Sequence, residues 1–168
     1  MASRSRIAAL SVAAIGAAPV GGALASQHVF GLVPCKLCLW QRQPYYAGVP
    51  LALLVALLPG PWRRRGLPLL ALIFAVSVGL GGYHAGVEWG LFLGPSDCGG
   101  GASQAGNVGD FLQSLNRVKV VSCTEAAWRF LGLSLAGWNA VVSALLVAVA
   151  LWGATRPRQG SSSLSQYR

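Results

Sequence analysis

The chain has 168 residues, of which 54% are hydrophobic and only 10% are charged. Soluble domains carry roughly 25% charged residues, so this composition excludes an ordinary globular enzyme. The 13 basic and 4 acidic residues give a net charge of +9, but the apolar fraction argues against nucleic-acid binding, and 4 cysteines are too few for a disulfide-dense scaffold.

The first apolar stretch, residues 7–25, contains no charged residue. Crossing about 30 Å of hydrocarbon takes roughly 20 helical residues, so this stretch is predicted to be a transmembrane helix. Its basic start and its Ala23-Leu24-Ala25 ending also fit a cleaved secretory signal peptide. Both interpretations stay open from the residues alone, and we expect the segment to be retained.

The connection at 26–39 contains the C-x-x-C pair Cys35 and Cys38. We expect Pro34 to occupy the first position of a helix, which places both sulfurs on one face near a positive helix end, where a thiolate is favoured. A disulfide closing so small a loop adds little stability, so the spacing favours a reversible dithiol. Arg42 is predicted to support the thiolate and to hold a carbonyl-bearing acceptor; the alternative is an arginine that reaches lipid phosphates.

Two further spans are predicted at 40–58 and 67–83, separated by a basic connection. The first of them has only a short apolar stretch between Pro44 and Pro59. Pro44 removes a helix hydrogen bond, so we expect it to interrupt the helix and to produce a kink at the bilayer surface.

The long connection at 84–135 begins with His84, four residues before Glu88. A histidine at this position is either a hydrogen-bonded interfacial residue or a group that passes protons with a redox carrier. Further along, 110–115 has apolar residues on one side, which fits a segment on the membrane surface and equally a segment packed within the loop.

The other two cysteines, Cys98 and Cys123, lie in the same connection. Three glycines follow Cys98, so we expect this cysteine to be mobile. Cys123 lies in a Ser-x-x-Glu pattern that predicts the start of a helix at 126–131. The residues also allow two structural disulfides, with three possible pairings, or a zinc site, although the wide spacing of this second pair disfavours zinc.

A last span is predicted at 136–152, and the tail at 156–168 is expected to be disordered. The termini and the middle connection carry eight basic residues and no acid, whereas 26–44 and 84–135 carry five basic and all four acidic residues. Basic residues near span ends stay cytoplasmic. The sequence therefore predicts an all-α integral membrane protein: one domain over 1–155, a four-transmembrane-helix bundle with cytoplasmic termini and both cysteine loops outside.

This arrangement resembles the disulfide-bond formation protein B (DsbB) family, quinone reductases of the bacterial inner membrane. The resemblance covers about 7–152. Its most specific element is the segment Pro34-Cys35-Lys36-Leu37-Cys38-Leu39-Trp40-Gln41-Arg42, followed by Cys98 and Cys123 in a long outer loop before the last span.

The resemblance implies a quinone-dependent dithiol oxidase with four catalytic cysteines. Cys98 would be attacked by a reduced DsbA-like periplasmic protein, with Cys123 as the leaving thiolate. Cys123 would then exchange with Cys35, and Cys38 would pass electrons to ubiquinone or menaquinone beside Arg42.

The resemblance also implies that His84 lies near the quinone, although it is offset by one residue from the family histidine when counted back from Cys98. The implied partners are the DsbA-like protein, quinone and the lipid bilayer, with no metal and no nucleic acid. The alternatives are a membrane scaffold or metal-binding protein with structural disulfides, and a family paralogue that serves one special partner.

Overall fold

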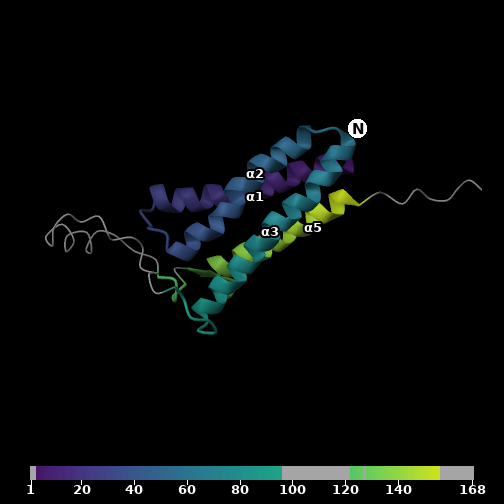
Figure 1. Ribbon diagram of the computed structural model, residues 1–168. Coiled ribbons are helices and arrows are strands. Elements are labelled where there is room, and N and C mark those ends of the chain that lie inside the picture. Colours follow the sequence, from purple (N-terminus) through teal and green to yellow (C-terminus); the bar gives the residue numbers. More distant parts are fainter. Residues whose placement is uncertain (1–2, 96–121, 127, 156–168) are drawn as a thin grey trace, which may run out of the picture.

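The protein is mostly helical in the part of the chain that the computed structural model describes, residues 3–95, 122–126 and 128–155. Long helices dominate these residues, and a short antiparallel hairpin precedes the last helix (Figure 1). The elements are α1 (Arg4–His28), α2 (Lys36–Leu57), α3 (Gly60–Glu88), β1 (Arg129–Phe130), β2 (Leu133–Ser134) and α5 (Leu135–Ala154). The prediction of an all-α protein is confirmed in part, because these residues are mostly helical but include two short strands.

Three of the helices in the described residues, α1, α3 and α5, are long and apolar enough to cross a membrane. Large apolar side chains are exposed along the helices, as expected of surfaces that face lipid rather than water: Leu10, Leu53, Leu54, Leu57, Leu72, Val76, Val141, Leu145 and Leu151. These features indicate a membrane protein. α2 is not among the candidate spans, so its crossing stays a prediction.

The helix α2 continues through Pro44 and Pro50, so the predicted interruption at Pro44 is wrong. A membrane helix tolerates the missing hydrogen bond when packing on both sides holds it. Pro44 is itself buried, and so are Tyr45 and Gly48 in the turn of α2 that follows it.

The main core lies where α1, α2, α3 and α5 meet around Phe74, which is fully buried. A Cβ atom on Gly48 would lie 2.7 Å from the Phe74 ring, and one on Gly16 would lie 3.7 Å from it. Tyr45 meets the same ring edge-on, with a centroid distance of 5.4 Å. Small residues on α1 and α2 therefore provide the space that this large side chain of α3 fills.

A buried hydroxyl chain joins three of the helices. The Tyr45 hydroxyl is 2.8 Å from Ser143 Oγ, and Ser143 donates to Ser77 Oγ at 2.9 Å. Each hydroxyl therefore has a partner where no water is expected, which stabilises the contact of α2, α5 and α3.

The predicted helix at 126–131 is wrong, because β1 and β2 form a hairpin there. Leu131 and Gly132 both have positive φ, 51° and 82°, as a two-residue type I′ turn requires. Trp138 from α5 donates to the carbonyl oxygen of Phe130 at 3.0 Å and packs against its ring. These contacts with a later helix hold the segment in the extended form.

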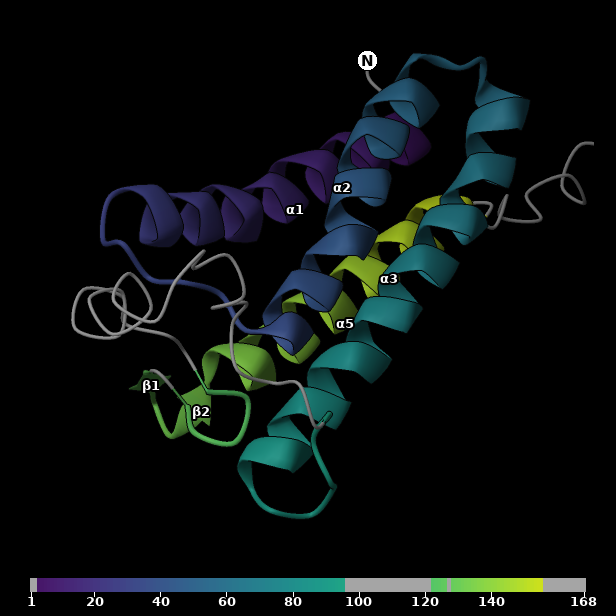
Figure 2. The ribbon, with the colours of Figure 1, turned by 60° about the vertical axis from the view of Figure 1, so that its left-hand side comes forward.

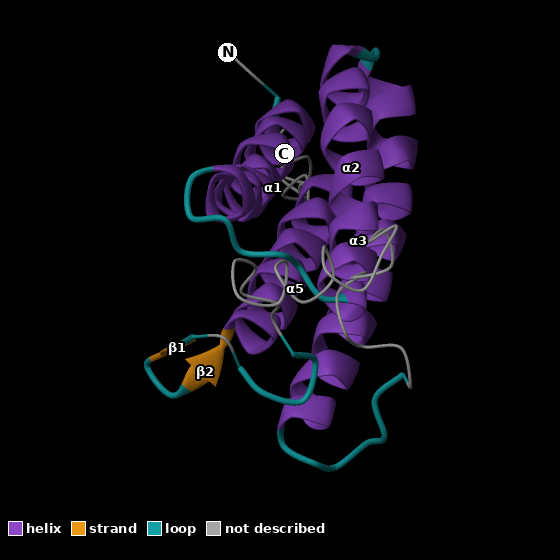
Figure 3. Ribbon diagram, turned by 90° about the vertical axis from the view of Figure 1, so that its left-hand side faces the viewer, coloured by secondary structure: helices purple, strands orange, loops and turns teal. Residues whose placement is uncertain are grey.

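Several segments that are far apart in the sequence lie near the start of α2. α3 and α5 lie side by side along most of their length (Figures 1 and 2). The hairpin, the last turns of α3 and the chain entering α2 all lie towards the same end (Figures 2 and 3). The loop at 122–126 reaches this end too, which brings distant segments together.

Candidate active site

The cysteines in the described residues lie in a small apolar cluster separate from the main core. Cys35 and Cys123 are fully buried, Leu37 and Val87 complete the cluster, and the partly buried Cys38 packs against it. The structure thus brings together three of the four cysteines predicted to be catalytic. Cys98 lies outside the described residues.

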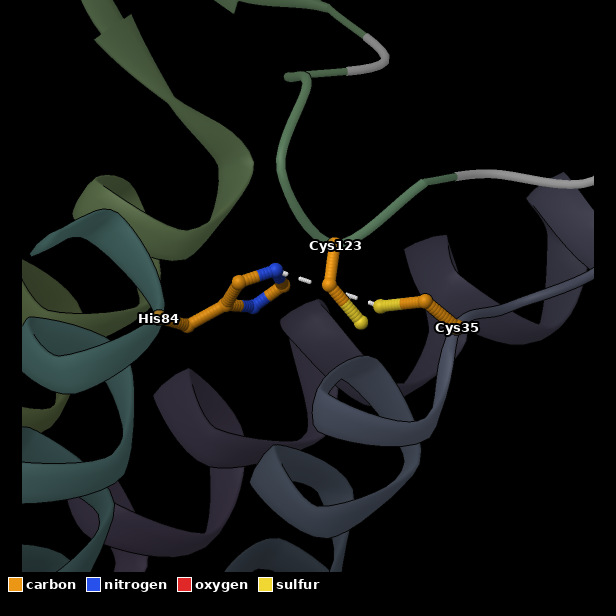
Figure 4. Close-up of side chains that lie close together, drawn as sticks. All are labelled: Cys35, His84 and Cys123. Carbon is orange, nitrogen blue, oxygen red and sulfur yellow. Dashed lines mark hydrogen bonds between the residues drawn. The ribbon is translucent and has the colours of Figure 1, made fainter. Parts of the chain in front are cut away.

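The sulfur of Cys35 lies next to that of Cys123. These two sulfur atoms and a ring nitrogen of His84 all lie within 4.8 Å of one another (Figure 4). Cys35 and Cys38 are free thiols, whereas Cys123 is disulfide-bonded. A free thiol beside a disulfide sulfur is the arrangement from which thiol-disulfide exchange starts.

Cys35 is the N-cap of α2, and the helix begins at Lys36. The expectation that Pro34 opens the helix is therefore wrong by two positions. Because Cys35 has extended rather than helical backbone angles, its Sγ accepts a hydrogen bond from the backbone N–H of Cys38 at 3.2 Å. A side chain at this position satisfies an N–H that the helix leaves unpaired, and it lies at the positive end of the helix dipole.

This environment favours the thiolate of Cys35. A hydrogen bond from the Cys38 side chain outweighs burial and lowers the pKa of Cys35 from 9.0 to about 5. The His84 side chain and the backbone N–H of Cys38 act in the same direction. At neutral pH, Cys35 is consequently in the nucleophilic form.

His84 is only 3% exposed and lies beside the sulfur atoms of Cys35 and Cys123. Its Nε2 is 3.9 Å from Cys35 Sγ, and its Nδ1 is hydrogen-bonded to Gln41 Nε2. Asn139 donates to Gln41 Oε1 at 2.7 Å. Sequence reasoning missed Gln41 and Asn139. The only sequence signal was their polarity, because Gln41 lies just before an apolar stretch and Asn139 lies within one.

Arg42 reaches across to α1. Its Nη1 donates to Gln27 Oε1 at 2.9 Å and its Nη2 to the carbonyl oxygen of Ala23 at 3.3 Å. A guanidinium has five N–H donors, and the bonds to Gln27 and Ala23 use two of them among the residues that the structure describes. Cys38 lies one helical turn before Arg42, on the same side of α2. This donor set fits a carbonyl-bearing ligand such as a quinone.

Cys35, His84 and Cys123 also have the atom types of a metal site. Zinc binds cysteine as the thiolate, and a sulfur in a disulfide cannot supply one. Because Cys123 is disulfide-bonded, the trio does not fit zinc in the state that the structure describes.

Known proteins place the chain in a family. The family model described as Disulfide bond formation protein DsbB matches residues 5–153. A Disulfide bond formation protein B from Marinobacter nauticus is 36% identical over 132 residues, which cover 75% of this chain and 77% of the relative. Proteins of the same name from Aromatoleum aromaticum and Albidiferax ferrireducens are 32% and 35% identical, covering 90% and 88% of this chain and 93% and 85% of the relatives. No solved structure matches significantly. The chain therefore belongs to the DsbB family, membrane oxidoreductases that act in disulfide bond formation.

Proposed function

We propose that the protein oxidises a periplasmic DsbA-like dithiol protein and passes two electrons through its own cysteines to a membrane quinone. The observation that carries this proposal is the contact between a free thiol, Cys35, and a disulfide sulfur, Cys123, in a buried cluster. Burial protects the exchange from external thiols, so electrons move between the two cysteine loops and not into solution.

The exchange begins at Cys98, which we propose as the disulfide partner of Cys123. A thiolate of the reduced partner attacks the Cys98 sulfur, a mixed disulfide forms, and Cys123 leaves as a thiolate. The second thiolate of the partner then attacks the partner's own sulfur in the mixed disulfide. The partner is released with its disulfide formed, and Cys98 is left as a thiolate. Cys123 passes the electron pair on by attacking Cys35 in a Cys35–Cys38 disulfide, with Cys38 as the leaving group. The Cys98 thiolate then attacks Cys123, which restores the Cys98–Cys123 disulfide and releases Cys35 as a thiolate beside Cys38.

We place the quinone beside Cys38 and Arg42. Ubiquinone or menaquinone supplies, when bound, an acceptor for two electrons and two protons. Arg42 would donate to a carbonyl oxygen of this ligand with the N–H groups that its bonds to Gln27 and Ala23 leave over. The quinone contact predicted for His84 stays a prediction, since both of its ring nitrogens face protein groups.

The Arg42 assignment can be separated from a purely structural role. If Arg42 only joins α2 to α1, Arg42→Gln should lower the stability of the protein more than Gln27→Ala, because it breaks the bonds to both Gln27 and Ala23, and neither variant should change the quinone KM. If Arg42 binds the quinone, Arg42→Gln should raise the quinone KM by about tenfold or more, as expected for the loss of a charge-assisted hydrogen bond, and Gln27→Ala should leave it nearly unchanged.

We also propose the membrane arrangement that this chemistry requires. α2 is the fourth span of the 1–155 domain, both termini and the basic 63–65 connection are cytoplasmic, and the cysteine loops face the periplasm across the bacterial inner membrane. The distribution of basic residues supports this orientation.

The test is a coupled assay on the full chain purified in detergent. A reduced DsbA-like protein and a short-chain quinone are added, and the absorbance of the oxidised quinone is followed. We expect its loss to depend on the partner protein, to vanish in Cys35→Ser and Cys38→Ser, and to persist in Gln43→Ala, a change at an exposed position of the same helix. Absence of a partner-dependent signal would overturn the proposal.

A further inference from the structure

A buried polar chain runs from α5 through α2 to the reacting sulfur. Asn139 donates to Gln41 Oε1 at 2.7 Å, Gln41 Nε2 contacts His84 Nδ1, and His84 Nε2 lies 3.9 Å from Cys35 Sγ. The same Nε2 is 3.9 Å from Glu88 Oε1, one turn further along α3. Gln41 is 7% exposed and the side chain of Glu88 5%, so these groups interact with little screening by water.

The surroundings of the two ring nitrogens decide which one holds the proton. Nε2 faces a thiolate-forming sulfur and a carboxylate, both of which accept hydrogen bonds when ionised. A lone pair on Nε2 would be repelled by both, so the proton belongs on Nε2. Nδ1 is then an acceptor, and its partner must donate.

Gln41 can donate only in one orientation of its amide group. With its NH₂ turned to His84 Nδ1, its carbonyl oxygen faces the Asn139 NH₂, which donates to it. In the reversed orientation, the Gln41 oxygen would face His84 Nδ1 and would require the ring proton there. Nε2 would then have no proton to donate towards Cys35. Asn139 therefore stabilises the orientation of Gln41, and Gln41 that of His84.

We propose that Gln41 and Asn139 are positioning residues that hold His84 as the Nε2–H tautomer, with this N–H directed at the sulfur where Cys35 and Cys123 exchange. The significance for exchange rests on the proposed function. When the Cys35 thiolate attacks Cys123, the Cys35–Cys123 bond forms, the earlier disulfide of Cys123 breaks, and the released sulfur takes the electron pair. In the reverse direction Cys35 is the leaving thiolate. His84 keeps its proton in both and stabilises the negative sulfur.

The tautomer can be measured without any activity assay. The chain has 2 histidines, so His28→Gln leaves His84 as the single signal after labelling with ¹⁵N-histidine. Long-range ¹H–¹⁵N spectra of the reduced protein in detergent distinguish the Nε2–H from the Nδ1–H form. We expect the Nε2–H form to dominate in the parent protein.

Gln41→Leu removes the donor to Nδ1, and we expect the ratio of Nε2–H to Nδ1–H to fall about two- to tenfold, the equivalent of one hydrogen bond. Gln41→Glu provides an acceptor there, so it should shift the ring towards a protonated Nδ1. Asn139→Ala should change the ratio in the same direction as Gln41→Leu, by less. The matched control is Gln43→Leu at an exposed position of α2, which should leave the ratio unchanged.

A dominant Nδ1–H form in the parent protein, or equal ratios in the parent and in Gln41→Leu, would overturn the proposal. Gln41→Glu keeps the size and polarity of the side chain, so it provides the test if Gln41→Leu does not fold. The expected tautomer in a protein that shows no thiol-disulfide exchange would support the positioning role and contradict the proposed function, so the two failures are distinguishable.

Discussion

The backbones of α3 and α5 come close together at Gly81, and a substitution at this position tests their packing. A Cβ atom on Gly81 would lie 2.9 Å from the backbone nitrogen of Ala140 and 3.1 Å from the carbonyl oxygen of Ala136. Ordinary contacts begin at 3.4 Å, so the shortest contact falls short by about 0.5 Å. The obstacles are backbone atoms that cannot rotate away, so α3 and α5 must separate.

Overpacking of this kind costs about 1–3 kcal/mol. Alanine in place of glycine also strengthens a helix, by about 1 kcal/mol at exposed positions. Gly79 and Gly82 isolate this second effect, because a Cβ atom at either would meet nothing within 4 Å. We therefore expect the free energy of unfolding of Gly81→Ala to lie about 1–3 kcal/mol below those of Gly79→Ala and Gly82→Ala.

The assay is reversible unfolding in mixed detergent, followed by circular dichroism on all three variants. Asn139 precedes Ala140 on α5, so the separation of α3 from α5 should also lengthen the hydrogen bond between Asn139 and Gln41. Gly81→Ala should therefore slow thiol-disulfide exchange as well. Equal stability of Gly81→Ala and the two controls would refute the close helix contact.

Two further predictions concern the hydroxyl chain and the thiolate. Tyr45→Phe should lower the free energy of unfolding by about 0.5–1.5 kcal/mol, because it leaves Ser143 with one hydrogen-bond partner fewer. Tyr46→Phe, at an exposed position of α2, should change this free energy little. The same unfolding assay compares the two variants, and equal effects would contradict the stabilising role of the Tyr45–Ser143–Ser77 hydroxyl chain. With Cys35 and Cys38 as free thiols and Cys123 still in its disulfide, thiolate absorbance near 240 nm should report one thiol with a pKa of about 5, ionised above that pH and protonated below it. Cys38→Ala removes the largest cause of this lowering and should move the midpoint to higher pH; an unchanged midpoint would count against the hydrogen bond.

Much of the fold follows from local sequence. Apolar stretches without charges identify α1, α3 and α5, because a charged side chain inside such a stretch would be costly in a bilayer. The C-x-x-C pair likewise identifies Cys35 and Cys38 as a dithiol, since the spacing alone places the two sulfurs within reach of each other.

The parts that sequence reasoning missed depend on contacts between distant residues. Gln41 meets His84 across 43 positions and Asn139 across 98, and no local pattern reports such pairs. The hairpin at β1 and β2 formed where a helix was predicted, because Trp138, eight positions further along on the next helix, donates a hydrogen bond to the carbonyl oxygen of Phe130. At Pro44, the interruption was predicted from the loss of one helix hydrogen bond, but α2 continues there because its packing compensates for that loss.

The central claim, that electrons pass directly between Cys35 and Cys123, is tested most directly by trapping the bond between them. In Cys38→Ser the resolving thiol is absent, so Cys35 should attack Cys123 and the new disulfide should persist after acid quenching and alkylation. Peptide mapping without reductant should then find the Cys35 and Cys123 peptides linked, with one other thiol released for each link. A Cys35 that remains fully alkylated as a free thiol, with no link to Cys123, would contradict the account.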